Sequence, residues 1–139
     1  EYLNKYSGIK KFMEDIVEKA KEQGYVETLF NRRRYIPELK SNSYVVRQFG
    51  ARIAMNTPIQ GTAADIMKIA MIRVHQELEK RKLKSKLVLQ VHDELIIEAE
   101  KSEKEEVKEL LQNAMEEAIT LEIPLKAEVS EADNWYDAK

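Results

Sequence analysis

The segment Val91–Leu95, which reads VHDEL, places a histidine and two adjacent carboxylates between two apolar stretches of chain. These stretches, KLVLQV before it and LIIEA after it, are rich in the aliphatic and β-branched residues that favour strands. We therefore predict a tight β-hairpin with His92, Asp93 and Glu94 at its tip. Asn-Gly or Asp-Gly usually occupies such a tip, because these residues tolerate the backbone of the turn.

The charged tip admits two interpretations. Two carboxylates concentrate negative charge at a rigid, accessible point, and such a point suits a divalent cation. Alternatively, the tip is a polar turn that keeps the hairpin soluble. The pentapeptide alone does not separate a metal site from a solubilising turn, because short motifs match by chance.

A second polar group is formed by Arg52, Asn56 and Gln60, which follow one another at intervals of four residues. This spacing places all three side chains along one side of a helix, provided that the helix continues past Pro58. Together they offer a charged donor and two amides, which can contact base edges in the minor groove of duplex DNA. The same spacing also occurs on ordinary helix surfaces.

Arg32, Arg33 and Arg34 form the one run of consecutive arginines in the chain. They are candidates for contacts with nucleic-acid phosphates, each of which would strengthen binding through counterion release. The alternative is a structural role in which an arginine pairs with an acidic neighbour such as Glu27 or Glu38. We expect at least one of the three to be structural.

Composition narrows the class of protein. The chain has 139 residues, of which 43% are hydrophobic and 35% charged, as expected for one globular domain rather than a disordered chain. No apolar stretch approaches the roughly 20 residues of a membrane-spanning helix, and no signal peptide is visible. The formal net charge is −2, so any nucleic-acid site must be a local patch. Because the sequence does not begin with Met, we expect a fragment of a longer protein.

The elements that position these residues follow from hydrophobic spacing. Apolar residues between Ile9 and Ala20 recur at helical intervals, and Gly24 is a plausible helix end. A second helical region runs from about Ser43 to Lys82, with a kink or a break at Pro58. The remaining expected elements are the hairpin over 86–99, a helix capped by Ser102 with Glu105 reaching back, and a final strand over 125–129.

The motifs together resemble the C-terminal part of bacterial family A DNA polymerases, the DNA polymerase I type. The resemblance lies in NTPIQGTAAD at residues 56–65 and VHDEL at 91–95, and also in GYVETLF followed by RRRY at 24–35. The motifs stand in the order of the family and cover essentially the whole chain. The fold implied is α+β, with long helices packed on a small antiparallel sheet that contains the VHDEL hairpin. Residues 1–56 would derive from the fingers and residues 57–139 from the palm.

The resemblance implies roles for the candidate residues. Asp93 matches one of the two aspartates that hold the catalytic metal ions, Glu94 the supporting glutamate beside it, and His92 a contact to the primer terminus. Arg52, Asn56 and Gln60 are similar to residues that touch the minor groove of the primer-template. The chemistry would be two-metal nucleotidyl transfer with two Mg²⁺ ions, which fit because hard oxygen ligands are present and soft ones absent.

The sequence departs from a complete polymerase in lacking the family's other metal-binding aspartate, which lies upstream in a strand reading roughly DYSQ. The nucleotide-binding fingers helix and the thumb are also absent. We therefore expect a catalytic segment of a cytoplasmic, nucleoid-associated polymerase that acts on primer-template DNA and deoxynucleoside triphosphates with its upstream segment, and that is inactive alone.

The sequence also permits two other hypotheses about function. One is a non-catalytic module that binds duplex DNA and carries vestigial carboxylates. The other is a stand-alone metal-dependent hydrolase, against which the absence of a His-x-x-x-His or Asp-x-Asp cluster argues.

Overall fold

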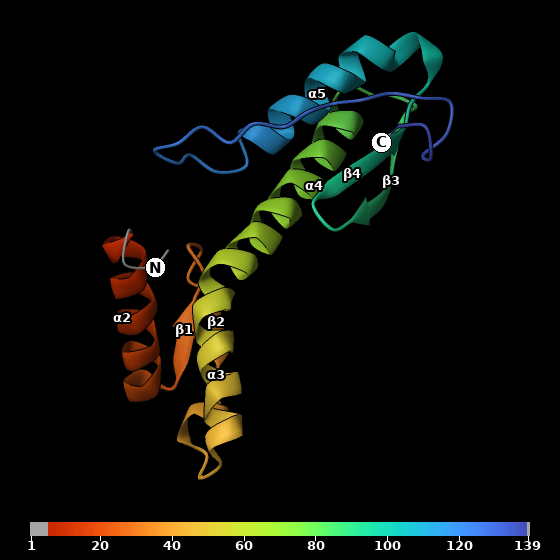
Figure 1. Ribbon diagram of the computed structural model, residues 1–139. Helices are drawn as coiled ribbons and strands as arrows, with labels where there is room; N and C mark the ends of the chain where they lie inside the picture. Colours follow the sequence, from red (N-terminus) through yellow and green to blue (C-terminus); the bar gives the residue numbers. More distant parts are fainter. Residues whose placement is uncertain (1–5, 139) are drawn as a thin grey trace. The chain divides into compact units, whose positions relative to one another are not determined.

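The computed structural model describes residues 6–138, and its chain divides into two compact units, Glu1–Ala63 and Ala64–Lys139 (Figure 1). The first unit contains the helix α2 (Ser7–Gln23), strands β1 (Tyr25–Glu27) and β2 (Arg33–Tyr35), the 3₁₀ turn η1 (Pro37–Lys40), helix α3 (Tyr44–Asn56) and the π-helical turn η2 (Thr57–Gly61). Helix α4 (Thr62–Lys80) follows, and then come β3 (Lys86–Val91), β4 (Glu94–Glu98), η3 (Lys101–Glu103) and α5 (Lys104–Glu116).

The first unit begins with the predicted amphipathic helix. Helix α2 ends at Gly24, whose φ of 84° lies in the left-handed region and lets its N–H bond back to the carbonyl of Ala20. The chain then forms the short antiparallel pair of β1 and β2. A small apolar core joins these elements to η1 and α3, and it consists of Ala20, Val26, Ile36, Leu39 and Ala54.

Pro58 neither ends the helix nor produces a simple kink. Helix α3 runs to Asn56, and the following residues form a π-helical turn before α4 begins at Thr62. Proline cannot donate the backbone hydrogen bond that an α-helix requires at that position, and a wider turn absorbs the missing bond. The break expected at Pro58 is therefore a local widening of the helix.

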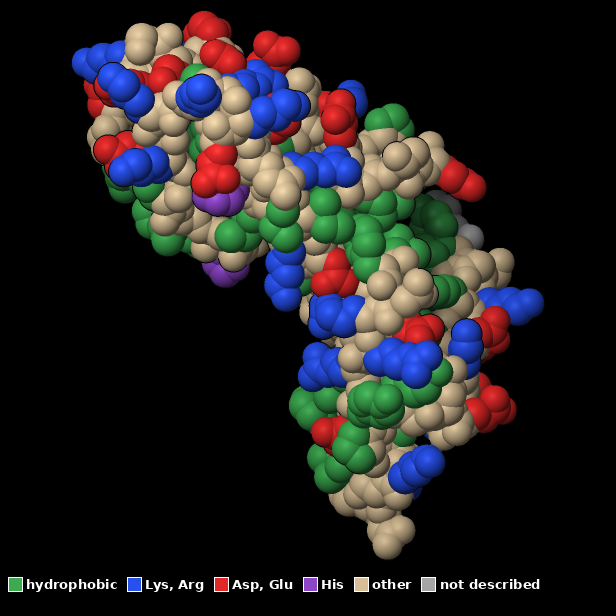
Figure 2. Space-filling model, turned by 180° about the vertical axis from the view of Figure 1, so that it is seen from behind, with side chains coloured by type: hydrophobic (Ala, Val, Ile, Leu, Met, Phe, Trp, Pro, Cys, Tyr) green, Lys and Arg blue, Asp and Glu red, His purple; other side chains and the backbone are tan. Residues whose placement is uncertain are grey.

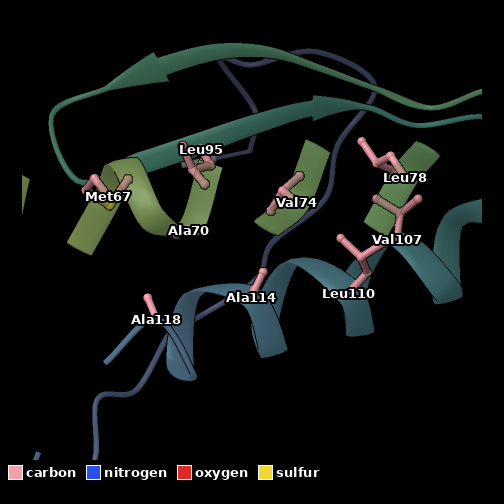
Figure 3. Packing of buried hydrophobic residues seen from close by; sticks show 9 residues of the cluster. All are labelled: Met67, Ala70, Val74, Leu78, Leu95, Val107, Leu110, Ala114 and Ala118. Carbon is pink, nitrogen blue, oxygen red and sulfur yellow. The ribbon is translucent and has the colours of Figure 1, made fainter. Parts of the chain in front are cut away.

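The second unit is built around the inner face of α4. Met67, Ala70, Val74 and Leu78 recur along this face, and Figure 3 shows them pointing toward the hairpin and α5. The partners in the core are Leu95 from β4 and Val107, Leu110, Ala114 and Ala118 from α5 and the residues after it. This face of α4 and the facing side of α5 thus form the core of the second unit.

The hairpin of β3 and β4 is antiparallel, as predicted, but its ladder contains an irregularity. Leu87 pairs with Ile97, whereas beyond Val88 the pairs shift, so that Leu89 lies opposite Ile96. Val88 is the extra residue of a β-bulge, which bends and twists the strand that carries it. The ladder ends at the pair of Val91 and Glu94, leaving His92 and Asp93 in the turn.

Two of the expected elements differ from those observed. Residues 125–129 do not form a strand in the described chain, although their burial alternates as in a strand, because no neighbouring strand pairs with their backbone. The cap predicted at Ser102 is also wrong. Ser102 lies inside η3, and α5 begins at Lys104 without a side-chain cap. The carboxylate of Glu103, just before α5, does not cap the helix either. It accepts hydrogen bonds from the backbone N–H groups of Lys84 and Ser85, which precede β3.

The α+β fold class is confirmed: each unit combines helices with a small two-stranded antiparallel sheet. The assignment of residues 1–56 to the fingers and of residues 57–139 to the palm stays a prediction. Among residues 6–138, no helix is long and apolar enough to cross a membrane.

Candidate functional site

The turn of the β3–β4 hairpin presents its acidic side chains to solvent. His92, Asp93 and Glu94 are all exposed, whereas Leu95, the next residue, is buried in the core of the second unit. His92 adopts a φ of 52°, in the left-handed region that residues with a Cβ rarely occupy. Gln90 supports this backbone, because its side-chain Nε2 donates to the carbonyl of His92 at 2.6 Å. The turn is thus held after the carboxylates by the buried side chain of Leu95, and before them by the hydrogen bond from Gln90.

The donor set of this turn fits part of a magnesium site. Asp93 and Glu94 supply hard carboxylate oxygens, the ligands that Mg²⁺ prefers. Within residues 6–138, however, no group of three or more histidine, aspartate or glutamate side chains is arranged to hold a metal ion.

The three residues of the polar row lie together in the first unit. Arg52, Asn56 and Gln60 line one open hollow of about 400 Å³. The wide turn at Pro58 is compatible with the row, because α3 carries the first two residues and η2 carries the third. The structure thus brings the row into one concave surface, while its contact with DNA stays a prediction.

Two of the three consecutive arginines join the same hollow, which is also lined by Arg32 and Arg34. Arg32 is held there by a hydrogen bond from its guanidinium to the carbonyl of Gly61, at 3.2 Å. The hollow therefore collects three guanidinium groups and two amides. This set can donate hydrogen bonds to phosphate and to base acceptors alike.

Arg33 is the structural arginine of the run. Its Nε donates to Oε1 of Glu27 at 2.8 Å, and its guanidinium lies 4.5 Å from the centre of the Tyr25 ring. The hydrogen bond with Glu27 raises the pKa of Arg33. Glu27 is one of the two acidic partners that the sequence suggested, and Arg33 is thereby neutralised within its own sheet.

Two threonines, which no sequence motif had marked, connect the arginine loop to η2 beside the hollow. The hydroxyl of Thr62 accepts from the backbone N–H of Leu29 at 3.0 Å and donates to the carbonyl of Pro58. Thr28, which is 4% exposed, accepts through Oγ1 from the N–H groups of Phe30 and Arg32. These bonds join the arginine loop to η2. The signal in the sequence was weak, because threonines are frequent on exposed surfaces.

The charge on the surface is mixed. Figure 2 shows Lys and Arg side chains interspersed with Asp and Glu over the visible face, and no single field of one sign covers it. This distribution agrees with a net charge of −2. Any attraction for a polyanion must therefore come from a local group such as the arginines of the hollow.

Comparison with known proteins gives consistent matches. The model of the DNA polymerase family A matches residues 1–137. DNA polymerase I of Bacillus subtilis (strain 168) is 53% identical over 138 residues, which are 99% of this chain and 16% of that protein. DNA polymerase I of Caldicellulosiruptor bescii is 51% identical, with the same coverage.

A solved structure agrees with these matches. The POL domain of Pol1 from M. smegmatis, in complex with DNA primer-template and dNTP, matches with a TM-score of 0.87 and 42% identity, over 90% of this chain and 22% of that one. This chain therefore spans a minor part of each of these three proteins.

Proposed function

This chain belongs to DNA polymerase family A, and on that basis we propose that it is the C-terminal catalytic segment of a DNA-directed DNA polymerase. The observation that carries the proposal is the hairpin turn. Asp93 and Glu94 are exposed there, and the preceding residue, His92, adopts a left-handed backbone conformation that costs free energy. A turn that served only solubility would use Gly or Asn at that position. Strained residues with a larger side chain are found mainly at functional sites.

The reaction would be nucleotidyl transfer. The primer 3′-hydroxyl oxygen attacks the α-phosphorus of the nucleoside triphosphate, the bond from that phosphorus to the bridging oxygen breaks, and pyrophosphate leaves. Asp93 would hold the divalent cations together with a carboxylate of the upstream segment, and Glu94 would support the site. When bound, two Mg²⁺ ions would supply charge neutralisation at the triphosphate and a lowered pKa of the attacking hydroxyl.

The other candidate residues would bind and orient the nucleic acid. Arg52, Asn56 and Gln60 would donate to the minor-groove acceptors that every base pair presents in similar places, and such contacts check the shape of the pair without requiring one sequence. Arg32 and Arg34 would contact phosphates beside them. His92, next to Asp93 in the turn, would position the primer terminus.

The partners of the segment would be primer-template DNA, deoxynucleoside triphosphates and the upstream polymerase segment with the second metal aspartate. We expect the chain alone to be inactive, because a two-metal site needs more carboxylates than the turn supplies. Since the relatives are bacterial, we place the enzyme in the cytoplasm at the nucleoid.

Primer extension on a primed template with Mg²⁺ tests the proposal, using this chain together with the upstream palm, fingers and thumb segment. We expect Asp93→Asn to lower the rate by at least about a thousandfold, because several kcal/mol of charge stabilisation would be lost. Glu98→Gln is the matched control, since Glu98 is an exposed carboxylate on the same hairpin, away from its turn.

The outcome separates the polymerase from the alternative functions. If Asp93→Asn left extension intact, the carboxylate would have no catalytic role. If the segment bound duplex DNA but never supported extension with its upstream partner, a non-catalytic binding module would be the better description. Extension by the chain alone would mean that its own residues complete the metal site.

A further inference from the structure

The two ends of the β3–β4 hairpin meet at one buried serine. Ser85 precedes β3 and is 4% exposed. Its Oγ accepts a hydrogen bond from the backbone N–H of Glu100, just beyond β4, at 3.0 Å. The same hydroxyl donates to Oε2 of Glu103 at 2.6 Å. The open end of the hairpin is therefore closed by side-chain bonds as well as by the strand ladder.

Glu103 completes this closure from the adjacent turn η3. Its two carboxylate oxygens accept from the backbone N–H of Lys84, at 2.9 and 3.0 Å, and Oε2 also accepts from the N–H of Ser85 at 2.9 Å. These hydrogen bonds, led by the one from Lys84, lower the pKa of Glu103, so the carboxylate is charged at neutral pH. We call Ser85, Glu103 and the backbone of Lys84 and Glu100 the clasp.

The clasp matters because the register of the hairpin differs between its two ends. Near the clasp, Lys86 pairs with Glu98, while near the turn Val91 pairs with Glu94, and the bulge at Val88 reconciles the two registers. If Val88 instead paired with Ile96, Gln90 would face Glu94. The turn would then consist of residues 91–93, and Asp93 would occupy a different place.

We propose that Glu103 is a positioning residue for Asp93, acting through the clasp on the register of the hairpin. The clasp holds the base of β3 in place, and Leu95 holds β4 in the core. The bulge therefore stays at Val88, and the turn keeps His92 and Asp93. A slip of one residue exchanges the faces of every side chain in the part that slips, so a small freedom at the base becomes a large displacement at the tip.

The inference rests on the proposed function, since it concerns where the catalytic carboxylate lies. Without the clasp, the base of the hairpin is free to sample neighbouring registers and the bulge to migrate along β3. Only part of the molecules would then carry Asp93 in its productive place. The effect belongs to the chemical step, because neither Glu103 nor Ser85 takes part in the proposed contacts with DNA or nucleotide.

Steady-state primer extension by the complete polymerase tests this with the variant Glu103→Ala. We expect kcat to fall about ten- to a hundredfold, as for a misplacement of about 1 Å, with the KM for nucleotide unchanged. Amide hydrogen exchange in β3 and β4 should become faster, which reports the loosened register directly. Glu109→Ala is the matched control, since Glu109 is an exposed glutamate of α5 outside the clasp.

A rescue experiment distinguishes a shift in the register of the hairpin from a general loss of stability as the cause of a lower kcat. Lys86 and Glu98 are exposed partners in the ladder, and this segment contains no cysteine, so the pair Lys86→Cys and Glu98→Cys can form a disulfide across the base. In the Glu103→Ala background, oxidation should restore kcat and slow the exchange, and reduction should reverse both.

Two results would overturn the inference: an unchanged kcat in Glu103→Ala, or a disulfide that forms without restoring kcat. Failure of the proposed function would look different. In that case Asp93→Asn would retain full extension, whatever Glu103 does.

Discussion

At the scale of single residues, each of the two candidate surfaces contains one position that is constrained by backbone geometry. His92 holds a left-handed φ of 52° in the turn that bears Asp93. Gly61 lies at the end of η2, where a Cβ would approach Cγ2 of the buried Thr28 to 2.8 Å. A histidine in a position that favours glycine indicates selection for its side chain. A glycine whose Cα lies too close to a neighbour to admit a Cβ, such as Gly61, indicates selection for the absence of a side chain.

We therefore expect Gly61→Ala to lower the free energy of unfolding by about 1–3 kcal/mol, because Thr28 and the arginine loop must move to admit the methyl group. The matched control is Gly8→Ala, where a Cβ would meet nothing within 4 Å and would lie in α2. There we expect no loss, and a gain of up to about 1 kcal/mol from helix propensity. Urea denaturation of both variants measures the difference, and equal stabilities would contradict the close packing at Gly61.

At the scale of elements, strand β2 directs the side chains of two adjacent arginines, Arg33 and Arg34, to opposite faces of the sheet. Arg33 is paired with Glu27 across the sheet, while Arg34 lines the hollow with Arg52, Asn56 and Gln60. Successive residues of a strand point to opposite faces. The strand therefore assigns one arginine to structure and makes the other available to a ligand.

Arg34→Ala should weaken binding of primer-template DNA by the complete polymerase and reduce the slope of log K against log salt by about 1, as expected for one lost phosphate contact. Arg33→Ala is its neighbour control and should leave that slope unchanged, because its charge is already compensated by Glu27. Fluorescence anisotropy over a range of salt concentrations measures both. An equal change of slope in the two variants would refute the assignment.

At the scale of the whole molecule, the acid sensitivity should be concentrated in the second unit. Four of its carboxylates have a pKa below the ordinary value of 4.5: Glu77 bonded to Lys80 and Arg81, Glu103 in the clasp, Glu116 beside the N–H of Ala127, and Glu131 between Lys104 and Lys108. A carboxylate whose pKa is lower in the folded state stabilises it above its unfolded pKa, and loses that contribution as the pH falls through the folded value.

The second unit should accordingly lose stability as the pH falls below about 4.5, the ordinary value for glutamate. Trp135, the one tryptophan of the chain, lies in this unit and reports its unfolding by fluorescence. The combined variant with Glu103, Glu116 and Glu131 changed to Gln should show a flatter dependence of the urea midpoint on pH. An unaltered pH dependence in that variant would show that other groups control the acid transition.

The sequence by itself determined the elements whose signals are local. The spacing of apolar residues predicted α2 and its end at Gly24, and the aliphatic runs around VHDEL predicted the hairpin with its acidic turn. The family motifs, which are also contiguous in sequence, predicted the membership that the comparisons show. These features depend on residues close together in the chain, so the sequence contains their cause.

The tertiary structure decided the features that depend on residues far apart in the chain. It selected Glu27 as the partner of Arg33, and it brought Arg32 and Arg34 beside the polar row. It also assigned Glu103 to the clasp rather than Ser102 to a helix cap, and it left residues 125–129 without a paired strand. Each outcome depends on contacts between residues far apart in the chain, and local sequence patterns do not specify which of these contacts form.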